Sequence, residues 1–194
     1  STLERYRARL DEVSTALSNR EVEDAVVLRD VLLTMQRTEM VRRIAKEIED
    51  HITELGTEGR LIRLQLDELV SAVDEDRVLL VRDYLADRRR KVANVLEDLD
   101  ELNTDELLTL DNLASVLSYA TDEMDHAVSP RGYRLLSRIP RLPEAVIAKL
   151  VKRFSSLQGV MDASLADLDD VEGVGETRAR SIRDGLNRLA ENAL

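Results

Sequence analysis

The chain has 194 residues, of which 43% are hydrophobic and 35% charged, and its formal net charge at pH 7 is −11. It contains no cysteine or tryptophan, which excludes disulfides, thiolate metal sites and a cysteine nucleophile, and its few aromatic residues exclude a base-stacking platform. Only seven Gly and three Pro occur, which indicates an almost wholly helical protein, and no apolar run reaches the ~18 residues of a membrane span. We therefore expect a cytoplasmic location and no membrane partner.

Charge and composition both change near residue 128. Residues 1–128 carry 17 Lys+Arg against 30 Asp+Glu, whereas residues 129–194 carry 11 against 9. All three prolines and five of the seven glycines lie in the second part. The change predicts two domains, an acidic helical spine at residues 1–126 and a second domain at residues 127–194. Acidity argues against nucleic-acid binding by the spine alone, because the local field decides what binds.

The apolar pattern of the spine predicts a helical bundle. Leucines recur every seven residues at positions 3, 10 and 17, which predicts a first helix ending near residue 18. A second apolar pattern covers about residues 22–55, and a third helix carries the stripe from Ile62 to Val73. Shorter helices are expected at 78–85, 92–102 and 106–117, with Asn103 and Glu106 forming a capping box. The basic run at residues 88–91 is interpreted as a solvated loop or helix start.

No catalytic, cofactor or metal site is predicted within these residues. Glu123 and His126 have the spacing of half a di-metal carboxylate site, but no second Glu-x-x-His exists to complete it. The pair Gly173 and Gly175 lacks the third glycine of a dinucleotide fingerprint, because Arg178 occupies that position. The chain is therefore expected not to be an enzyme by itself.

The most informative stretch lies at residues 164–182. Ser164 is a good N-cap for a short helix, on which Leu165, Leu168 and Val171 are expected to be buried. A Gly-Val-Gly turn at 173–175 follows, and a second helix begins at once. The pattern apolar-x-Gly-apolar-Gly-x-x-x-Ala-x-x-apolar resembles the helix-hairpin-helix motif. In that family, backbone N–H groups at the second helix bind a DNA phosphate, which is anion capture at a helix N-terminus.

A weaker copy of this motif lies 32 residues earlier. The apolar positions repeat, but Arg141 stands where Gly173 would be and Pro143 where Gly175 would be. The first copy is therefore expected to be architectural, because proline has no N–H to offer a phosphate. We predict sequence-independent contacts with the DNA backbone from the following residues: Gly173, Val174, Gly175, Thr177, Arg178, Arg180, Arg183, Arg141, Lys149 and Lys152.

Longer stretches carry a more specific resemblance. Ser-Pro-Arg-Gly-Tyr-Arg at 129–134, Ile-Pro-Arg-Leu-Pro at 139–143, Val-Arg-Asp-Tyr-Leu at 81–85, Leu-Gln-Leu-Asp-Glu-Leu at 64–69 and Gln-Arg-Thr-Glu-Met-Val at 36–41 are similar to the bacterial DNA-integrity-scanning diadenylate cyclase family. The resemblance covers the helical spine and the C-terminal helix-hairpin-helix domain. The Asp-Gly-Ala and Arg-His-Arg signatures of the family's cyclase domain are absent, so we expect a fragment that lacks this domain.

The resemblance implies an all-α fold, an elongated helical-bundle spine followed by a tandem helix-hairpin-helix domain. It implies that the missing domain makes cyclic di-AMP from ATP with Mg or Mn in a homo-oligomer. It also implies that these residues bind branched DNA, such as a Holliday junction, in the cytoplasm beside the bacterial nucleoid, and that repair proteins are partners. Two alternatives remain open: a non-catalytic helical scaffold for protein interaction, and a DNA-binding accessory fragment of a repair nuclease or helicase.

Overall fold

The computed structural model describes residues 1–52 and 56–192. This part is all-α: it contains eleven helices and no strand, and its sole β-type pairing is an isolated antiparallel bridge between Val27 and Ala127. No helix within it is long and apolar enough to cross a membrane.

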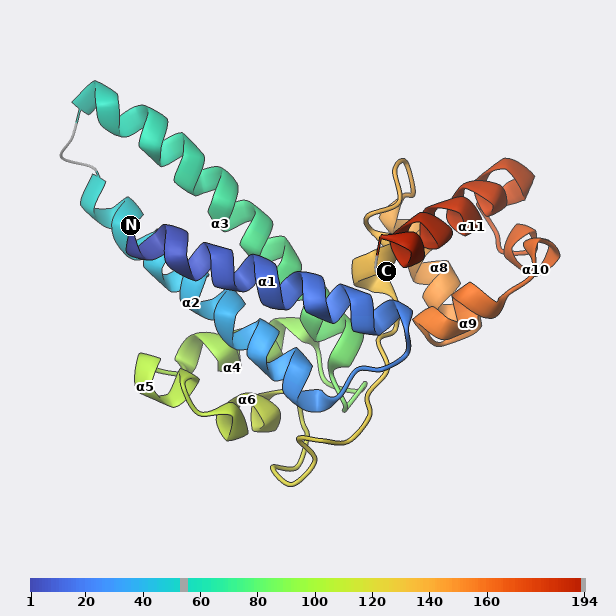
Figure 1. The fold of residues 1–194 in the computed structure, drawn as a ribbon, viewed down its shortest axis with the longest axis horizontal. Coiled ribbons are helices and arrows are strands. Elements are labelled where there is room, and N and C mark those ends of the chain that lie inside the picture. The colour runs from blue at the N-terminus through green and yellow to red at the C-terminus, as the bar shows by residue number, and fades with distance from the viewer. Residues whose placement is uncertain (53–55, 193–194) are drawn as a thin grey trace.

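Three long helices form the body of the spine. They are α1 (Thr2–Val22), α2 (Leu28–Ile52) and α3 (Gly56–Tyr84), which run side by side in Figure 1. Leu10, Val41 and Val73, one from each helix, are buried against one another, so the leucine repeat of α1 does face a core. The end of the second predicted helix, at residues 53–55, lies outside the described residues.

Three short helices cover one side of this body: α4 (Val92–Glu101), α5 (Thr104–Leu107) and α6 (Leu110–Val116). Their apolar side chains join the largest core of the spine, in which Leu28, Leu80, Leu99 and Leu113 are fully buried. The predicted capping box at the start of α5 is confirmed, because Asn103 Oδ1 accepts from the Glu106 amide at 2.8 Å while Glu106 Oε1 accepts from the Asn103 amide at 3.1 Å.

Several predicted helix boundaries were wrong. The first helix continues through Ser18 to residue 22, because the Ser18 hydroxyl donates to the Ser14 carbonyl at 3.0 Å and is thereby satisfied inside the helix. The separate helix expected at 78–85 is the end of α3, since no breaker interrupts residues 74–77. The helix expected at 106–117 is divided between α5 and α6, because Thr109 adopts an extended conformation as the N-cap of α6.

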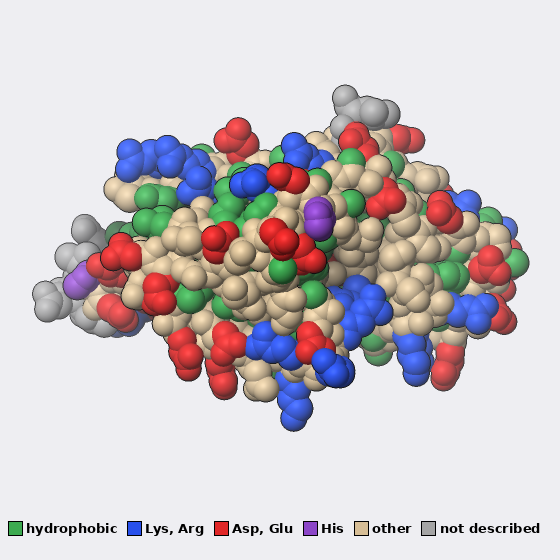
Figure 2. Space-filling view, turned by 90° about the horizontal axis from the view of Figure 1, so that it is seen from below, with side chains coloured by type: hydrophobic (Ala, Val, Ile, Leu, Met, Phe, Trp, Pro, Cys, Tyr) green, Lys and Arg blue, Asp and Glu red, His purple; other side chains and the backbone are tan. Residues whose placement is uncertain are grey.

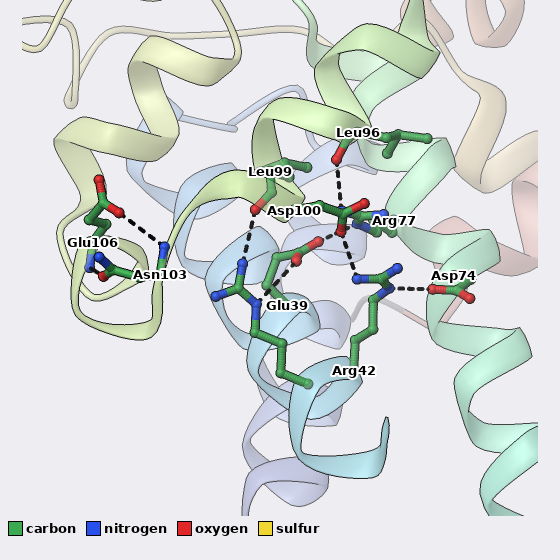
Figure 3. Close-up of polar contacts among 10 residues, drawn as sticks. Glu39, Arg42, Asp74, Arg77, Leu96, Leu99, Asp100, Asn103 and Glu106 are labelled. Atoms are coloured by element: carbon green, nitrogen blue, oxygen red, sulfur yellow. Dashed lines mark hydrogen bonds and ion pairs between the residues drawn. The ribbon is translucent and has the colours of Figure 1, made fainter. Parts of the chain in front are cut away.

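Buried ions hold α2, α3 and α4 together (Figure 3). Glu39 is fully buried and pairs with Arg77, which also donates to Asp100 at 2.7 Å and to the Leu96 carbonyl at 3.1 Å. Arg42 joins Asp74 at 2.6 Å to the same Asp100 at 2.9 Å. A buried charge is tolerated only when it is paired, and the pairing of buried Glu39 with Arg77 links α2 to α3.

The second domain consists of five helices at the other end of the molecule (Figure 1): α7 (Tyr133–Leu136), α8 (Glu144–Phe154), α9 (Leu157–Asp162), α10 (Leu165–Asp169) and α11 (Gly175–Glu191). They share one core, in which Leu136, Leu150, Leu168 and Ile182 are fully buried. Val22 of α1 packs against the same core, and α11 also contacts α1. The domain boundary at 126/127 stays a prediction.

Candidate nucleic-acid interface

The second hairpin, formed by α10, the turn and α11, has the local geometry that its sequence predicts. Ser164 and Asp167 form a capping box, in which Ser164 Oγ accepts from the Asp167 amide at 3.1 Å. Gly173 and Gly175 adopt φ of +88° and +67°, which other L-residues rarely adopt, and Val174 between them points into the core. One expectation was wrong: Leu165 is 41% exposed, because the short α10 turns it away from the core.

The turn leaves the start of α11 open. A Cβ added at Gly175 would meet nothing within 4 Å, so another molecule has room to approach the main chain there. The first-turn amides of a helix have no intrahelical partner, and their dipoles favour an anion. The Arg178 side chain folds back to donate to the Gly173 carbonyl at 2.5 Å, which places its guanidinium beside the turn. The second hairpin can therefore hold a phosphate.

The first hairpin, formed by α7, the turn and α8, shares part of the backbone and core pattern of the second. Arg141, 32 residues before Gly173, also has a positive φ, of +62°, although it is not glycine. The predicted apolar repeat is reflected in burial, since Leu136 and Leu150 are as fully buried as their counterparts Leu168 and Ile182. Pro143 has an extended backbone and offers no N–H. The first hairpin thus supplies a wall and a cation to the site.

The two hairpins enclose a groove of about 480 Å³, here called the inter-hairpin groove. Gly185 of α11 makes this pairing close, because a Cβ there would come within 3.0 Å of Ile139 Cγ1. Three arginines line the groove and none of its lining residues is acidic. On the face that Figure 2 presents, acidic and basic side chains are interspersed. The lining residues are Ile139, Pro140, Arg141, Leu142, Val174, Thr177, Arg178, Ser181, Ile182 and Arg188.

The structure brings only part of the predicted set into this groove. Arg141, Val174, Thr177 and Arg178 line it, and Gly173 and Gly175 form the adjoining turn. The other four predicted residues lie outside its lining. Arg180 pairs with Glu176 at 2.8 Å, Arg183 donates to the Ala163 carbonyl, Lys149 lies 3.4 Å from Glu172, and Lys152 is exposed on α8.

Sequence reasoning missed Arg188 and Ser181, which also line the groove. A signal for both was present, because residues 178, 181, 185 and 188 fall on one face of a helix at i, i+3, i+7 and i+10. The basic run at residues 88–91 is a loop before α4, as one of its interpretations expected. Arg89 pairs with Asp87, and Arg90 donates to the Val116 carbonyl at 2.9 Å.

A buried joint fixes the second domain to the spine. Asp83 at the end of α3 accepts hydrogen bonds from the amides of Gly132, Tyr133 and Arg134, at 3.0, 2.7 and 3.2 Å. Burial and the neighbouring Glu21 raise the pKa of Asp83 to about 7, against the opposing effect of the amides. Arg131 donates to the carbonyls of Arg82 and Leu85, so the entry to α7 is bound at several points.

The fold and the groove together define an all-α protein in which a tandem helix-hairpin-helix domain is mounted on a helical spine. The family model described as the DisA bacterial checkpoint controller linker region matches residues 1–125, and the helix-hairpin-helix motif matches residues 156–185. The chain therefore belongs to the DisA family. Neither matched part is a cyclase domain, and the two alternative functions considered above are not favoured.

Curated relatives match the chain over all or nearly all of its length. It is 56% identical over 199 residues to the "DNA integrity scanning protein DisA" of Acidothermus cellulolyticus and 54% identical over 200 residues to that of Streptomyces griseus, and both matches cover 100% of this chain. The protein of the same name from Acetivibrio thermocellus is 50% identical over 98% of the chain. The chain spans about half the length of the curated relatives it matches.

Proposed function

We propose that this chain binds the DNA backbone without regard to sequence, through the second hairpin and the inter-hairpin groove. The observation that carries the proposal is the open turn at Gly175, which leads directly into a groove lined by Arg141, Arg178 and Arg188 and by no carboxylate. Amides and guanidinium groups of this kind contact phosphates, which position a protein on DNA but carry no sequence information. The relatives' names, which refer to DNA integrity scanning, support the same function.

The wider role is proposed from the family. We infer that the whole protein is a bacterial diadenylate cyclase that makes cyclic di-AMP from ATP with Mg or Mn and acts as a homo-oligomer near the nucleoid. In that arrangement the 194 residues supply DNA sensing and its mechanical connection, and branched DNA such as a Holliday junction is the preferred form. No residue of the inter-hairpin groove is assigned to ATP or to a metal ion.

Fluorescence anisotropy tests the DNA proposal. A labelled four-way junction and a linear duplex of matched length are titrated with the chain across a salt series. Replacing Arg141, Arg178 or Arg188 with Ala should weaken binding to all sequences alike and lower the salt slope by about one phosphate contact each. Arg9→Ala, on the exposed face of α1, is the control for loss of one positive charge. If the groove variants behave like Arg9→Ala, the groove does not bind DNA.

A further inference from the structure

A second groove lies on the other side of the first hairpin, between α3 and the pair α7 and α8. It measures about 820 Å³ and is here called the acidic groove. Its lining residues are Glu49, Asp67, Val70, Ser71, Asp74, Glu75, Val78, Leu79, Arg82, Tyr133, Ser137, Leu142, Glu144 and Ile147.

The lining combines apolar and acidic side chains. Six of its residues are apolar or aromatic, from Val70 on α3 to Ile147 on α8, and five are carboxylates. The one basic residue, Arg82, is already engaged: it donates to Glu144 at 2.9 Å and its guanidinium lies 3.9 Å from the centre of the Tyr133 ring. The groove therefore combines apolar side chains with carboxylates, of which Asp74 is paired with Arg42 and Glu144 with Arg82. Its remaining negative charge repels DNA.

Two of the carboxylates that line the groove, Glu49 and Asp67, interact with each other. An interaction with the Asp67 side chain raises the pKa of Glu49, against the weaker effect of Arg63. Between the residues that the structure describes, no ion pair within 4.0 Å involves Glu49, Asp67 or Glu75. A cationic partner in the groove would relieve this repulsion and pair with these groups.

We propose that the acidic groove binds a basic amphipathic helix of a protein partner. Charge complementarity selects the partner's Lys and Arg residues, and the apolar lining residues accept a stripe at i, i+3, i+4 and i+7, which is the helix-in-groove mode of recognition. The side of the groove that α3 supplies runs from Asp67 to Arg82. At 1.5 Å rise per residue this is about 22 Å, which matches a partner helix of roughly four turns.

The position of the groove also connects the partner with DNA. Leu142 lines both the acidic groove and the inter-hairpin groove, so the turn of the first hairpin is the wall between them. A helix seated against Leu142 would bias the conformation of that turn, and any resulting effect on DNA binding must be reciprocal. Binding of the helix can be measured without DNA, so the two proposals can fail separately.

A designed peptide tests the proposal. The probe is a fluorescein-labelled 15-residue helix with Leu at i, i+3, i+4 and i+7 and Lys elsewhere, and its control is a peptide of the same composition with the leucine spacing scrambled. Binding is measured by anisotropy to the wild-type chain, to Asp67→Asn/Glu75→Gln in the groove, and to Glu97→Gln/Glu101→Gln on the exposed face of α4. Each pair of substitutions removes two negative charges.

We expect the groove variant to weaken peptide binding roughly fivefold or more and the α4 variant to leave it unchanged. The scrambled peptide should bind weakly, and DNA binding should persist in the groove variant. Equal losses in the two variants, or equal binding of the two peptides, would mean attraction to the acidic spine in general and would overturn the proposal. So would light scattering that shows a dimer dissociated by the groove substitutions, because the occupant would then be a second copy of the chain.

Discussion

Glu21 at the end of α1 and Arg134 in α7 form an ion pair that is buried on both sides, with side-chain exposures of 0% and 3%. The pair joins residues 113 positions apart and lies at the junction of the spine and the second domain. Tyr84 from the end of α3 donates its hydroxyl to the same carboxylate at 2.6 Å. One acidic side chain thus connects three elements that hold the second domain in place.

Glu21→Gln should destabilise the chain by about 3–5 kcal/mol, because it leaves the Arg134 guanidinium buried without its counter-ion. Glutamine keeps the side-chain volume of Glu21 and an oxygen that accepts from the Tyr84 hydroxyl. The loss of stability therefore measures the effect of removing the negative charge. Urea unfolding at pH 7, followed by circular dichroism, measures it. The double variant Glu21→Gln/Arg134→Met should lose less than Glu21→Gln alone, because no unpaired charge remains; equal stability of the single variant and wild type would contradict the expectation.

Stability should fall as the pH rises toward neutrality. Burial raises the pKa of Asp83 from 3.8 to about 7, so the folded chain holds this proton more tightly than the unfolded chain does. The stability that this proton contributes is fully present below the pKa of Asp83 in the unfolded chain. It is lost as the pH rises through the pKa of Asp83 in the folded chain. The urea midpoint should therefore fall between pH 5 and pH 8. Asp83→Asn, which cannot ionise, should flatten this dependence, and an unchanged slope would contradict the assignment.

Gly175→Asn should weaken DNA binding about tenfold, which corresponds to the loss of one hydrogen bond to a charged group. Asparagine tolerates the positive φ of +67° better than other residues, and the space around this position is open, so the hairpin should stay folded. The side chain would then occupy the place of the phosphate. Anisotropy with duplex DNA measures affinity, and a thermal melt checks the fold. A folded variant that binds like wild type would show that no phosphate approaches this turn.

Gly185→Ala should destabilise the second domain by about 1–2 kcal/mol, because its Cβ would come within 3.0 Å of Ile139 Cγ1. Helix propensity alone favours alanine over glycine by about 1 kcal/mol. The sign of the change in the free energy of unfolding therefore shows whether the close contact with Ile139 outweighs helix propensity. The double variant Gly185→Ala/Ile139→Ala should lose less stability than the sum of the losses of the two single variants. The new methyl group at residue 185 fills part of the space that the Ile139 side chain leaves. A stabilised single variant would mean that the two hairpins are packed more loosely.

The local features of the candidate site could be predicted from the sequence. The turn at 173–175 needs positive φ, and glycine at both ends of it signals this directly. The N-caps at Asn103 and Ser164 are likewise short-range patterns and were found where expected. The continuity of α3 was not foreseen, because the polar run at residues 74–77 interrupts the apolar stripe without interrupting the helix.

The features missed are long-range contacts. Asp83 and Glu21 look like ordinary surface carboxylates in a charged sequence, and only the packing of α1, α3 and α7 makes them buried partners. The groove needs two hairpins to face each other, so Arg141 and Arg188 come together through tertiary structure that no local spacing encodes. The same packing brings Arg183, which the sequence analysis predicted to contact DNA, to the Ala163 carbonyl.

The left-handed backbone at Arg141 lowers the stability of the first hairpin, while the Arg141 side chain supplies a positive charge to the groove. A non-glycine residue in this conformation costs roughly 1–2 kcal/mol, and the equivalent position of the second hairpin avoids the cost with glycine. Arg141→Gly would relieve the conformation and at the same moment remove one of three cations from the groove. Selection for folding alone would favour glycine here, whereas selection for holding an anion would keep arginine, so the residue found at this turn in other members of the family distinguishes which of the two pressures has acted.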